Sequence, residues 1–530
     1  MNIWIVNPFD QLPNETDVPL RYWSLCKTFA TQGHDVIWWS SDYSHLTKTK
    51  RSSCPDSDGF SVQLIETPPY TKNISFVRLK NHKAFANGFY NLATHKLNSG
   101  NLKAPDRIIV SLPPLGVAEQ AFRIRDLINN QSPIVSHPTT TSLCEVVVDI
   151  MDAWPETLYQ VLPKPLRKLM GPLLLAPMHR SAKRAYQGAD KISAVGQSYL
   201  ELAQKYLGQA SKVGSRKCEL SSQESGAAQD SAPQAYLLSE MSLTKTDEEG
   251  CSRDKLVANP QSNINYLSSK TSKPMFLCYH GTDLYRFQRN ELGIENYELR
   301  NTPHSYQPSA INHKSSLNKP LKAVYLGSMG QGYDLITIIQ VAARWKAEGQ
   351  FPFQIHFAGT GSQLKELKSK ARKYGLLPLT SDQPSAITDQ SSIIVGNDSP
   401  LVLNDSSRIV FHDYLQKEAI NILLMTSDLA LVPNRDDSLV ACPYKASEYA
   451  AAGVPMLSCL SGELNRLLSK WNAGTKYTEG NAESLHIAFQ NYLSDPDRLK
   501  QQSLSARKMA ETLFNREKSY EGLANFISLA

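Results

Sequence analysis

The chain has 530 residues, of which 41% are hydrophobic and 20% charged, a balance typical of soluble globular proteins. One hydrophobic core does not support this length, so we expect two or three domains. The net charge of +6 is mild and does not indicate a nucleic-acid partner. No run of 18 apolar residues predicts a membrane-spanning helix, and the start, MNIWIVNPF, does not read as a signal peptide. The eight scattered cysteines predict neither disulfides nor a zinc site, which fits a reducing cytoplasm.

Strands and helices alternate through the first half of the chain. A short apolar strand over 3–6 precedes a helix over about 20–32, which Gly33 closes. Several of the strands are continuous apolar runs, as in a parallel sheet buried on both faces. We therefore predict a doubly wound, Rossmann-like domain over 1–207. Its further strands are expected at 35–40, 62–65, 107–111, 145–150 and 191–194.

A polar segment over 208–272 interrupts this alternation and is predicted to be a disordered insertion. Similar polar stretches lie at about 290–319 and 380–407, and 273–319 is interpreted as an inter-domain segment. The alternation restarts at 321 and predicts a second doubly wound domain over 320–503, followed by a helical tail over 504–530. The strands of this domain are expected at 323–326, 353–358, 409–411 and 429–433.

Three loops of the second domain carry residues suited to an anionic ligand. The loop GSMGQG (327–332) follows a strand and precedes a helix, so its backbone can approach a phosphate. It matches neither the phosphate loop of nucleotide hydrolases nor the G-x-G-x-x-G of nicotinamide proteins. A second glycine turn (359–361) and Arg435 follow neighbouring strands, which predicts a nucleotide-sized cleft at one sheet edge. The expected phosphate-side residues are Gly327, Ser328, Gly330, Gln331, Gly332, Gly359, Thr360 and Gly361.

The segment 428–458 reads as a strand, a polar loop, a helix and a second strand. Lys445 and Glu448 are three residues apart, so they share one face of this helix. A carboxylate there can bind the diol of a sugar or ribose, and an ammonium can bind phosphate. The alternative is an ordinary surface ion pair.

Five motifs along the chain are DAWPE (152–156), HGTDL (280–284), VYLGS (324–328), FAGTG (357–361) and PYKASEYAAAGVP (443–455). Taken together, these motifs resemble the retaining glycosyltransferases of family 4, which have the GT-B fold, and in particular the bacterial branch that builds surface polysaccharides. The resemblance implies two Rossmann-like domains facing across a cleft, with the acceptor in the first and a nucleotide-diphosphate sugar in the second. It implies neither a cofactor nor a metal.

By this resemblance Glu448 binds the ribose hydroxyls, and Arg435, Lys445 and Glu448 form the expected catalytic group. Asp437 and Tyr449 complete the expected donor side.

Two departures from the family pattern affect the leaving-group contacts. Val440 stands where the family has a second glutamate, and Ser328 and Gln331 stand where it has a basic pair. Arg435 or Lys445 could supply the missing charge, and Asp436 or Asp437 the missing carboxylate.

The first domain is expected to hold the acceptor through Asn7, Arg21, Asp152, Trp154 and Glu156.

The basic segment 163–184, with an apolar centre, could lie on an anionic membrane surface. The alternative is a loop and a buried helix with solvated charges. Pro172 and Pro177 argue against one continuous helix there.

The predicted function is transfer of a sugar, with retention, from a nucleotide-diphosphate sugar to a glycan or lipid-linked acceptor in surface polysaccharide biosynthesis. The enzyme would be cytoplasmic, and it could bind the inner face of the membrane as a peripheral protein. One alternative is a sugar-nucleotide epimerase of the same fold, which would turn over without an acceptor. Another is a non-catalytic protein, which would bind the donor without releasing nucleoside diphosphate.

Overall fold

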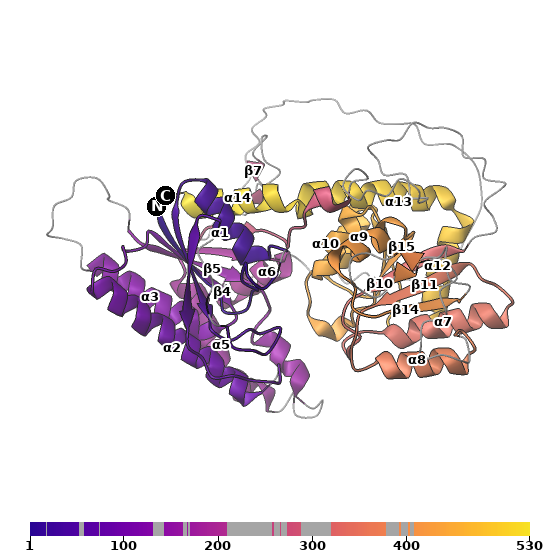
Figure 1. Ribbon diagram of the computed structural model, residues 1–530, viewed down its shortest axis with the longest axis horizontal. Coiled ribbons are helices and arrows are strands. Elements are labelled where there is room, and N and C mark those ends of the chain that lie inside the picture. The colour runs from indigo at the N-terminus through magenta and orange to yellow at the C-terminus, as the bar shows by residue number, and fades with distance from the viewer. Residues whose placement is uncertain are drawn as a thin grey trace, which may run out of the picture.

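The computed structural model forms two α/β lobes that lie side by side (Figure 1). The predicted polar insertions fall outside the described residues, apart from their ends and four two-residue strands: β7 (Val257–Ala258), β8 (Asn265–Tyr266), β12 (Ser392–Ile393) and β13 (Leu401–Val402). The structure describes residues 1–16, 18–51, 53, 58–73, 75–130, 143–162, 167, 170–208, 257–258, 265–266, 273–287, 320–377, 392–393, 401–402 and 407–529.

The first lobe is built on a sheet of order β3-β2-β1-β4-β5-β6-β9-β8-β7. Its strands from β3 to β9 are parallel, and β8 and β7 continue the edge in antiparallel pairing. The predicted bounds of β5 and β6 are confirmed. The parallel strands are β1 (Asn2–Val6), β2 (Asp35–Ser41), β3 (Phe60–Ile65), β4 (Arg107–Leu112), β5 (Glu145–Ile150), β6 (Lys191–Ala194) and β9 (Met275–Leu277).

Helices cover both faces of this sheet because alternate strand residues are apolar on each side. Trp4 and Val6 pack under α2 (Phe76–Asn98), α3 (Leu115–Asn130) and α5 (Gly171–Gly188). Ile3 and Ile5 pack under α1 (Arg21–Thr31) and α14 (Arg516–Ser528) on the other face. Gly33 follows α1 with φ of +81°, as its predicted role at the helix end requires. The sheet is therefore doubly wound, as predicted.

The second lobe has a wholly parallel sheet of order β14-β11-β10-β15-β16-β17. One face packs on α7 (Leu335–Ala347), α8 (Leu364–Lys373) and α12 (Ala482–Ser494). The other packs on α9 (Lys417–Met425), α10 (Tyr444–Ala451), α11 (Glu463–Trp471) and α13 (Pro496–Met509). The strands are β10 (Leu321–Leu326), β11 (Phe353–Ala358), β14 (Ile409–His412), β15 (Leu429–Val432), β16 (Met456–Ser458) and β17 (Gly474–Lys476).

Two chain segments link the lobes and run beside each other. The Thr282 amide donates to the Phe514 carbonyl at 2.7 Å, and the Arg516 amide donates to the Thr282 carbonyl at 3.2 Å. A Cβ at Gly281 would lie 2.5 Å from the Arg516 Cα, so the approach requires glycine. The helical tail then returns to the first lobe as α14, the yellow helix beside α1 in Figure 1.

The lobes also meet away from these links, at Glu463 in the first turn of α11. Its carboxylate accepts from the backbone amides of Gln197 (2.6 Å) and Ser198 (3.0 Å), at the start of α6 (Gln197–Tyr206). It also accepts from the hydroxyls of Ser198 (2.9 Å) and Tyr279 (2.6 Å). A carboxylate of the second lobe thus caps a helix of the first.

Of the two prolines expected to interrupt the basic segment, Pro177 does not, because it lies inside α5. Pro172 does lie at a helix boundary, since α5 begins at Gly171 after a turn at Met170. Pro172 lies in the first turn, where a backbone N–H has no helical acceptor. Pro177 leaves the carbonyl four residues earlier without its helical partner, but Leu173 is 74% exposed and water can reach it. Within the described residues, none of the helices has the length and apolarity needed to cross a membrane.

Candidate functional site

The two glycine turns of the second lobe interlock at the carboxyl edge of its sheet. β10 and β11 are neighbours in the sheet, so their following loops lie together. The Gly327 amide donates to the Ala358 carbonyl at 2.9 Å, and the Met329 amide donates to the Thr360 carbonyl at 2.8 Å. A Cβ at Gly359, where φ is +130°, would lie 2.2 Å from the Gly327 carbonyl oxygen. Only glycine fits this approach, and it leaves Ser328, Gln331 and Gly332 exposed at the rim.

Lys445 places its ammonium against this loop from the first turn of α10. A Cβ at Gly327 would be 2.7 Å from the Lys445 Nζ. The Nζ lies 4.4 Å from the ring centre of Tyr325 and 4.7 Å from that of Tyr333. The buried Nζ has no hydrogen-bond partner among the described residues. Burial lowers the pKa of Lys445 from 10.5 to about 7, although the Glu448 charge acts to raise it.

Glu448 lies one turn further along α10 and is held by an arginine from the inter-domain segment. The Arg286 Nη1 donates to the Glu448 Oε1 at 3.0 Å, and the Arg286 Nη2 donates to the Asn421 Oδ1 at 2.9 Å. The Glu448 side chain is 16% exposed, so part of the carboxylate remains accessible. Lys445 and Glu448 therefore lie on one helix face, as predicted, but they do not form a surface ion pair with each other.

Tyr449, expected on the donor side, lies beneath the phosphate loop. It is fully buried, and its hydroxyl accepts from the Leu326 amide at 2.9 Å. This contact fixes the end of β10 from which the loop starts, so Tyr449 supports the loop from the core.

Arg435 follows β15, the other neighbour of β10, so the three expected loops do meet at one sheet edge. Its guanidinium pairs with Glu479 at 3.0 Å, and its backbone amide donates to the Gly332 carbonyl at 3.0 Å. Asp436 accepts a hydrogen bond from the Ser461 hydroxyl at 2.8 Å, and Asp437 is exposed. Unlike Lys445, Arg435 and Asp436 are thus engaged with neighbours on the β16 and β17 side.

Two residues expected on the acceptor side, Asn7 and Arg21, use their side chains for contacts inside the first lobe. The Asn7 side chain donates to the Ser111 hydroxyl at 3.0 Å and accepts from two backbone amides. Arg21 is 3% exposed and pairs with Asp149 through two nitrogens, at 2.8 and 2.9 Å. Both side chains are therefore in the core rather than at the surface of the cleft.

Asp152 and Trp154 lie beyond β5 among side chains from other loops. The Trp154 ring is 5.4 Å from that of His82 and 5.6 Å from the Arg78 guanidinium carbon. Burial raises the pKa of Asp152. Glu156, the fifth expected residue, accepts from the Tyr206 hydroxyl at 2.8 Å and belongs to a separate cluster with His179.

Sequence reasoning missed Arg286, Tyr325, Tyr333 and Arg78. Arg286 follows the HGTDL motif by two residues, and a lone arginine in the apolar run LYRF is a signal of a buried ion pair. The two tyrosines belong to the strand and loop that flank the glycines. Nothing in the local sequence distinguishes Arg78 from a solvated helix charge.

No family model matches the chain, and no curated protein matches its sequence. Its fold is similar to that of many solved structures. Sucrose-phosphate synthase from Thermosynechococcus elongatus is 12% identical, with a TM-score of 0.55, and 99% of this chain and 97% of that chain are covered. WaaG, a glycosyltransferase involved in lipopolysaccharide biosynthesis, is 12% identical, with a TM-score of 0.51 and full coverage of both chains. Anabaena HepE in complex with UDP is 10% identical, with a TM-score of 0.52 and full coverage of both. The chain therefore has the GT-B fold of these glycosyltransferases.

Proposed function

We propose that this protein is a retaining glycosyltransferase that moves a sugar from a nucleotide-diphosphate sugar to a glycan or lipid-linked acceptor in surface polysaccharide biosynthesis. The observation that carries the proposal is the buried ammonium of Lys445 beside the glycine loop, which lacks a hydrogen-bond partner among the described residues. A buried charge without a partner is costly and is found mainly where a ligand supplies the opposite charge. Similar structures that carry UDP and UDP-glucose support a uridine nucleotide as the first donor to test.

In this proposal the diphosphate of the donor lies along 327–332. Negative charge develops on the departing phosphate during transfer, and the Lys445 ammonium stabilises it from a site that is already dry. Glu448, oriented by Arg286, binds the ribose hydroxyls. Retention follows if a phosphate oxygen of the donor receives the proton of the acceptor on the face that the leaving group occupied, so no protein base is assigned. The cleft between the lobes must exclude water, since hydrolysis would otherwise compete.

The domain roles in the proposal follow the two lobes. Residues 1–207 hold the acceptor, 320–503 hold the donor, and 273–319 join them. The enzyme acts in the cytoplasm at the inner face of the membrane. Exposed Leu173 and Leu174 beside exposed Arg180 and Lys183 support contact with anionic lipid through α5. Flotation with anionic vesicles checks this, and equal flotation of a variant with both basic residues neutralised would remove it.

The decisive experiment measures UDP binding by calorimetry and UDP release from UDP-glucose. Lys445→Met should weaken UDP binding by about ten- to a hundredfold, because a charge-assisted contact to phosphate is lost. Lys470→Met, at an exposed lysine of α11, is the matched control and should bind like the wild type.

Three outcomes contradict the proposal. Equal UDP affinity in Lys445→Met and wild type would remove the phosphate site. Conversion of the donor to another sugar nucleotide without UDP release would indicate an epimerase. Binding without either reaction, in the presence of cell-envelope lipid extract as acceptor, would indicate a non-catalytic protein.

A further inference from the structure

A group of cationic and imidazole side chains lies at the carboxyl edge of the sheet in the first lobe. The proposed donor site does not use them. We call Lys48, His45, Arg78 and His82 the Arg78 cluster. His45 and Lys48 follow β2, and Arg78 and His82 lie in the first turns of α2. Carboxyl ends of parallel strands are where open α/β sheets bind ligands, and the cluster is at such an edge.

Contacts within the cluster gather its nitrogens around aromatic side chains. The Arg78 Nε donates to the His82 Nε2 at 3.2 Å, and its guanidinium lies over the rings of Phe9 (5.4 Å) and Trp154 (5.6 Å). The Lys48 Nζ is 3.4 Å from the His45 Nδ1 and 4.5 Å from the centre of the Tyr70 ring. The aromatic neighbours Phe9, Tyr70 and Trp154 come from the loops after β1, β3 and β5. The fold therefore brings the cluster and its aromatic neighbours together.

Negative charge near the cluster is scarce. Of the described carboxylates, Asp152 is the one that acts on Arg78, and burial raises the pKa of Asp152. Burial, and then the Arg78 charge, lower the pKa of His45 to about 4 and that of His82 to about 3. Burial also lowers the pKa of Arg78. Burial and neighbouring positive charge thus disfavour the protonated forms of these side chains, and a bound anion would offset that effect.

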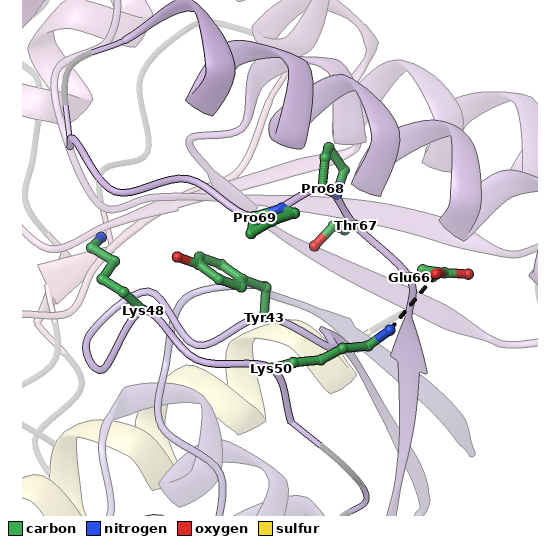
Figure 2. Close-up of a pocket in the computed structure, with 7 residues that line it drawn as sticks. All are labelled: Tyr43, Lys48, Lys50, Glu66, Thr67, Pro68 and Pro69. Atoms are coloured by element: carbon green, nitrogen blue, oxygen red, sulfur yellow. Dashed lines mark ion pairs between the residues drawn. The ribbon is translucent and has the colours of Figure 1, made fainter.

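A cavity of about 670 Å³, large enough for a sugar-sized ligand, has Lys48 of the cluster in its lining. Figure 2 shows Lys48 and the Tyr43 hydroxyl on one side of it, while Lys50 extends to the other side, toward Glu66. Lys50 is already paired with Asp42 at 3.3 Å and with Glu66 at 3.7 Å. The Lys48 ammonium instead donates to a neutral group, the Asn73 Oδ1, at 2.7 Å, so its charge can act on an anion at that side of the cavity, and Lys50 provides a matched control.

We propose that the Arg78 cluster binds a phosphate group on the acceptor. Arg78 Nη1 donates to the Asn73 carbonyl at 2.6 Å and Lys48 Nζ donates to the Asn73 Oδ1 at 2.7 Å. The guanidinium and the ammonium still have more N–H groups than these contacts and the imidazole contacts use, and such groups suit the oxygens of a phosphate. The assignment of this phosphate to the acceptor rests on the proposed function, but binding of the anion does not. Phe76 (85% exposed) and Val77 (48% exposed) precede Arg78 and could contact a lipid chain, so both a lipid phosphate and the phosphate of a soluble sugar are tested.

Calorimetry with defined probes tests the proposal on the full chain. Glucose 6-phosphate should bind at least about tenfold more tightly than glucose, and Arg78→Gln and Lys48→Gln should each remove most of this preference. Lys50→Gln should retain it. Farnesyl phosphate compared with glucose 6-phosphate separates the two sources, since tighter binding of the first assigns the phosphate to a lipid and tighter binding of the second to a soluble sugar.

The same titrations separate this site from the donor site. Lys445→Met should weaken UDP binding and leave glucose 6-phosphate unchanged, whereas Arg78→Gln should do the reverse. Equal binding of glucose and glucose 6-phosphate by the wild type would overturn the inference, as would a loss of glucose 6-phosphate binding in Lys445→Met alone. Because Lys48 is partly exposed, Lys48→Gln keeps the test valid if Arg78→Gln fails to fold.

Discussion

Two buried cations, Arg21 in the first lobe and Lys445 in the second, have opposite surroundings. In the first lobe, Arg21 donates to both oxygens of Asp149 and to the Cys278 carbonyl. Asp149 also accepts from the hydroxyls of Tyr22 and Ser193 at 2.7 Å each. In the second lobe, the Lys445 ammonium has no hydrogen-bond partner among the described residues and lies against two aromatic faces and a glycine loop. A buried charge with a complete set of partners stabilises the fold, whereas one without them indicates a site that an anion completes.

The largest effect should come from breaking the complete pair. Although burial alone would raise it, the Arg21 charge and the hydrogen bonds hold the pKa of Asp149 below its ordinary value. Asp149→Asn leaves the Arg21 charge unpaired in the core, so we expect a loss of about 3–5 kcal/mol in the free energy of unfolding, measured with urea. Glu366→Gln, which breaks the exposed pair with Lys370, should cost less than about 0.5 kcal/mol. Similar losses in the two variants would contradict the contrast.

A smaller effect, of opposite sign, should follow from removing the incomplete cation. Lys445→Met relieves an unpaired buried charge, so we expect a gain of about 1–3 kcal/mol in unfolding free energy at pH 7. The pKa of Lys445 is about 7 in the fold and near 10.5 when unfolded, so between these values the unfolded chain binds more protons. Wild-type stability should therefore rise with pH across this interval, and the variant should lose that contribution to the slope.

UDP binding should show the reverse dependence on pH. Its affinity for the wild type should fall as pH rises through 7, because the ammonium loses its proton, and in Lys445→Met this component should vanish. A wild-type profile that is unchanged by the substitution would separate Lys445 from the donor.

The smallest effect concerns the support beneath the site. Tyr449→Phe leaves the Leu326 amide without its 2.9 Å acceptor, which should cost about 1 kcal/mol of stability. UDP affinity should fall by only a few fold, because Tyr449 acts through the loop. A loss of UDP affinity as large as in Lys445→Met would instead indicate direct contact with the donor.

Much of the fold could be predicted from the sequence because its strands are buried on both faces. Runs such as 145–150 and 353–358 are apolar or flanked by turns, and their predicted bounds match β5 and β11. α2 gave no such signal, since it buries Asn81 and His82 beside Phe85 and Phe89. The prediction from Pro177 failed for a different reason. Proline removes one hydrogen bond from a helix, and α5 tolerates that loss on its exposed side.

Only the part of the candidate site that depends on residue spacing along the chain could be predicted. Lys445 and Glu448 share a helix face, and the glycine turns follow adjacent strands, so both were accessible to reasoning from sequence. Arg286 lies 162 residues before its partner Glu448. The Arg78 cluster joins the loop after β2 to the start of α2. Such partners are brought together by tertiary packing, and the residue pattern around each one does not reveal the other.

The return of α14 has a consequence for how the molecule is made. Tyr520, Leu523, Phe526 and Ile527 complete the core that begins with Ile3 and Ile5. The core of the first lobe can therefore be completed only after the second lobe has also been synthesised. Until then the second domain has to fold beside an unfinished partner whose sheet face is covered by α1 alone, and removal of α14 would damage the lobe that contains β1.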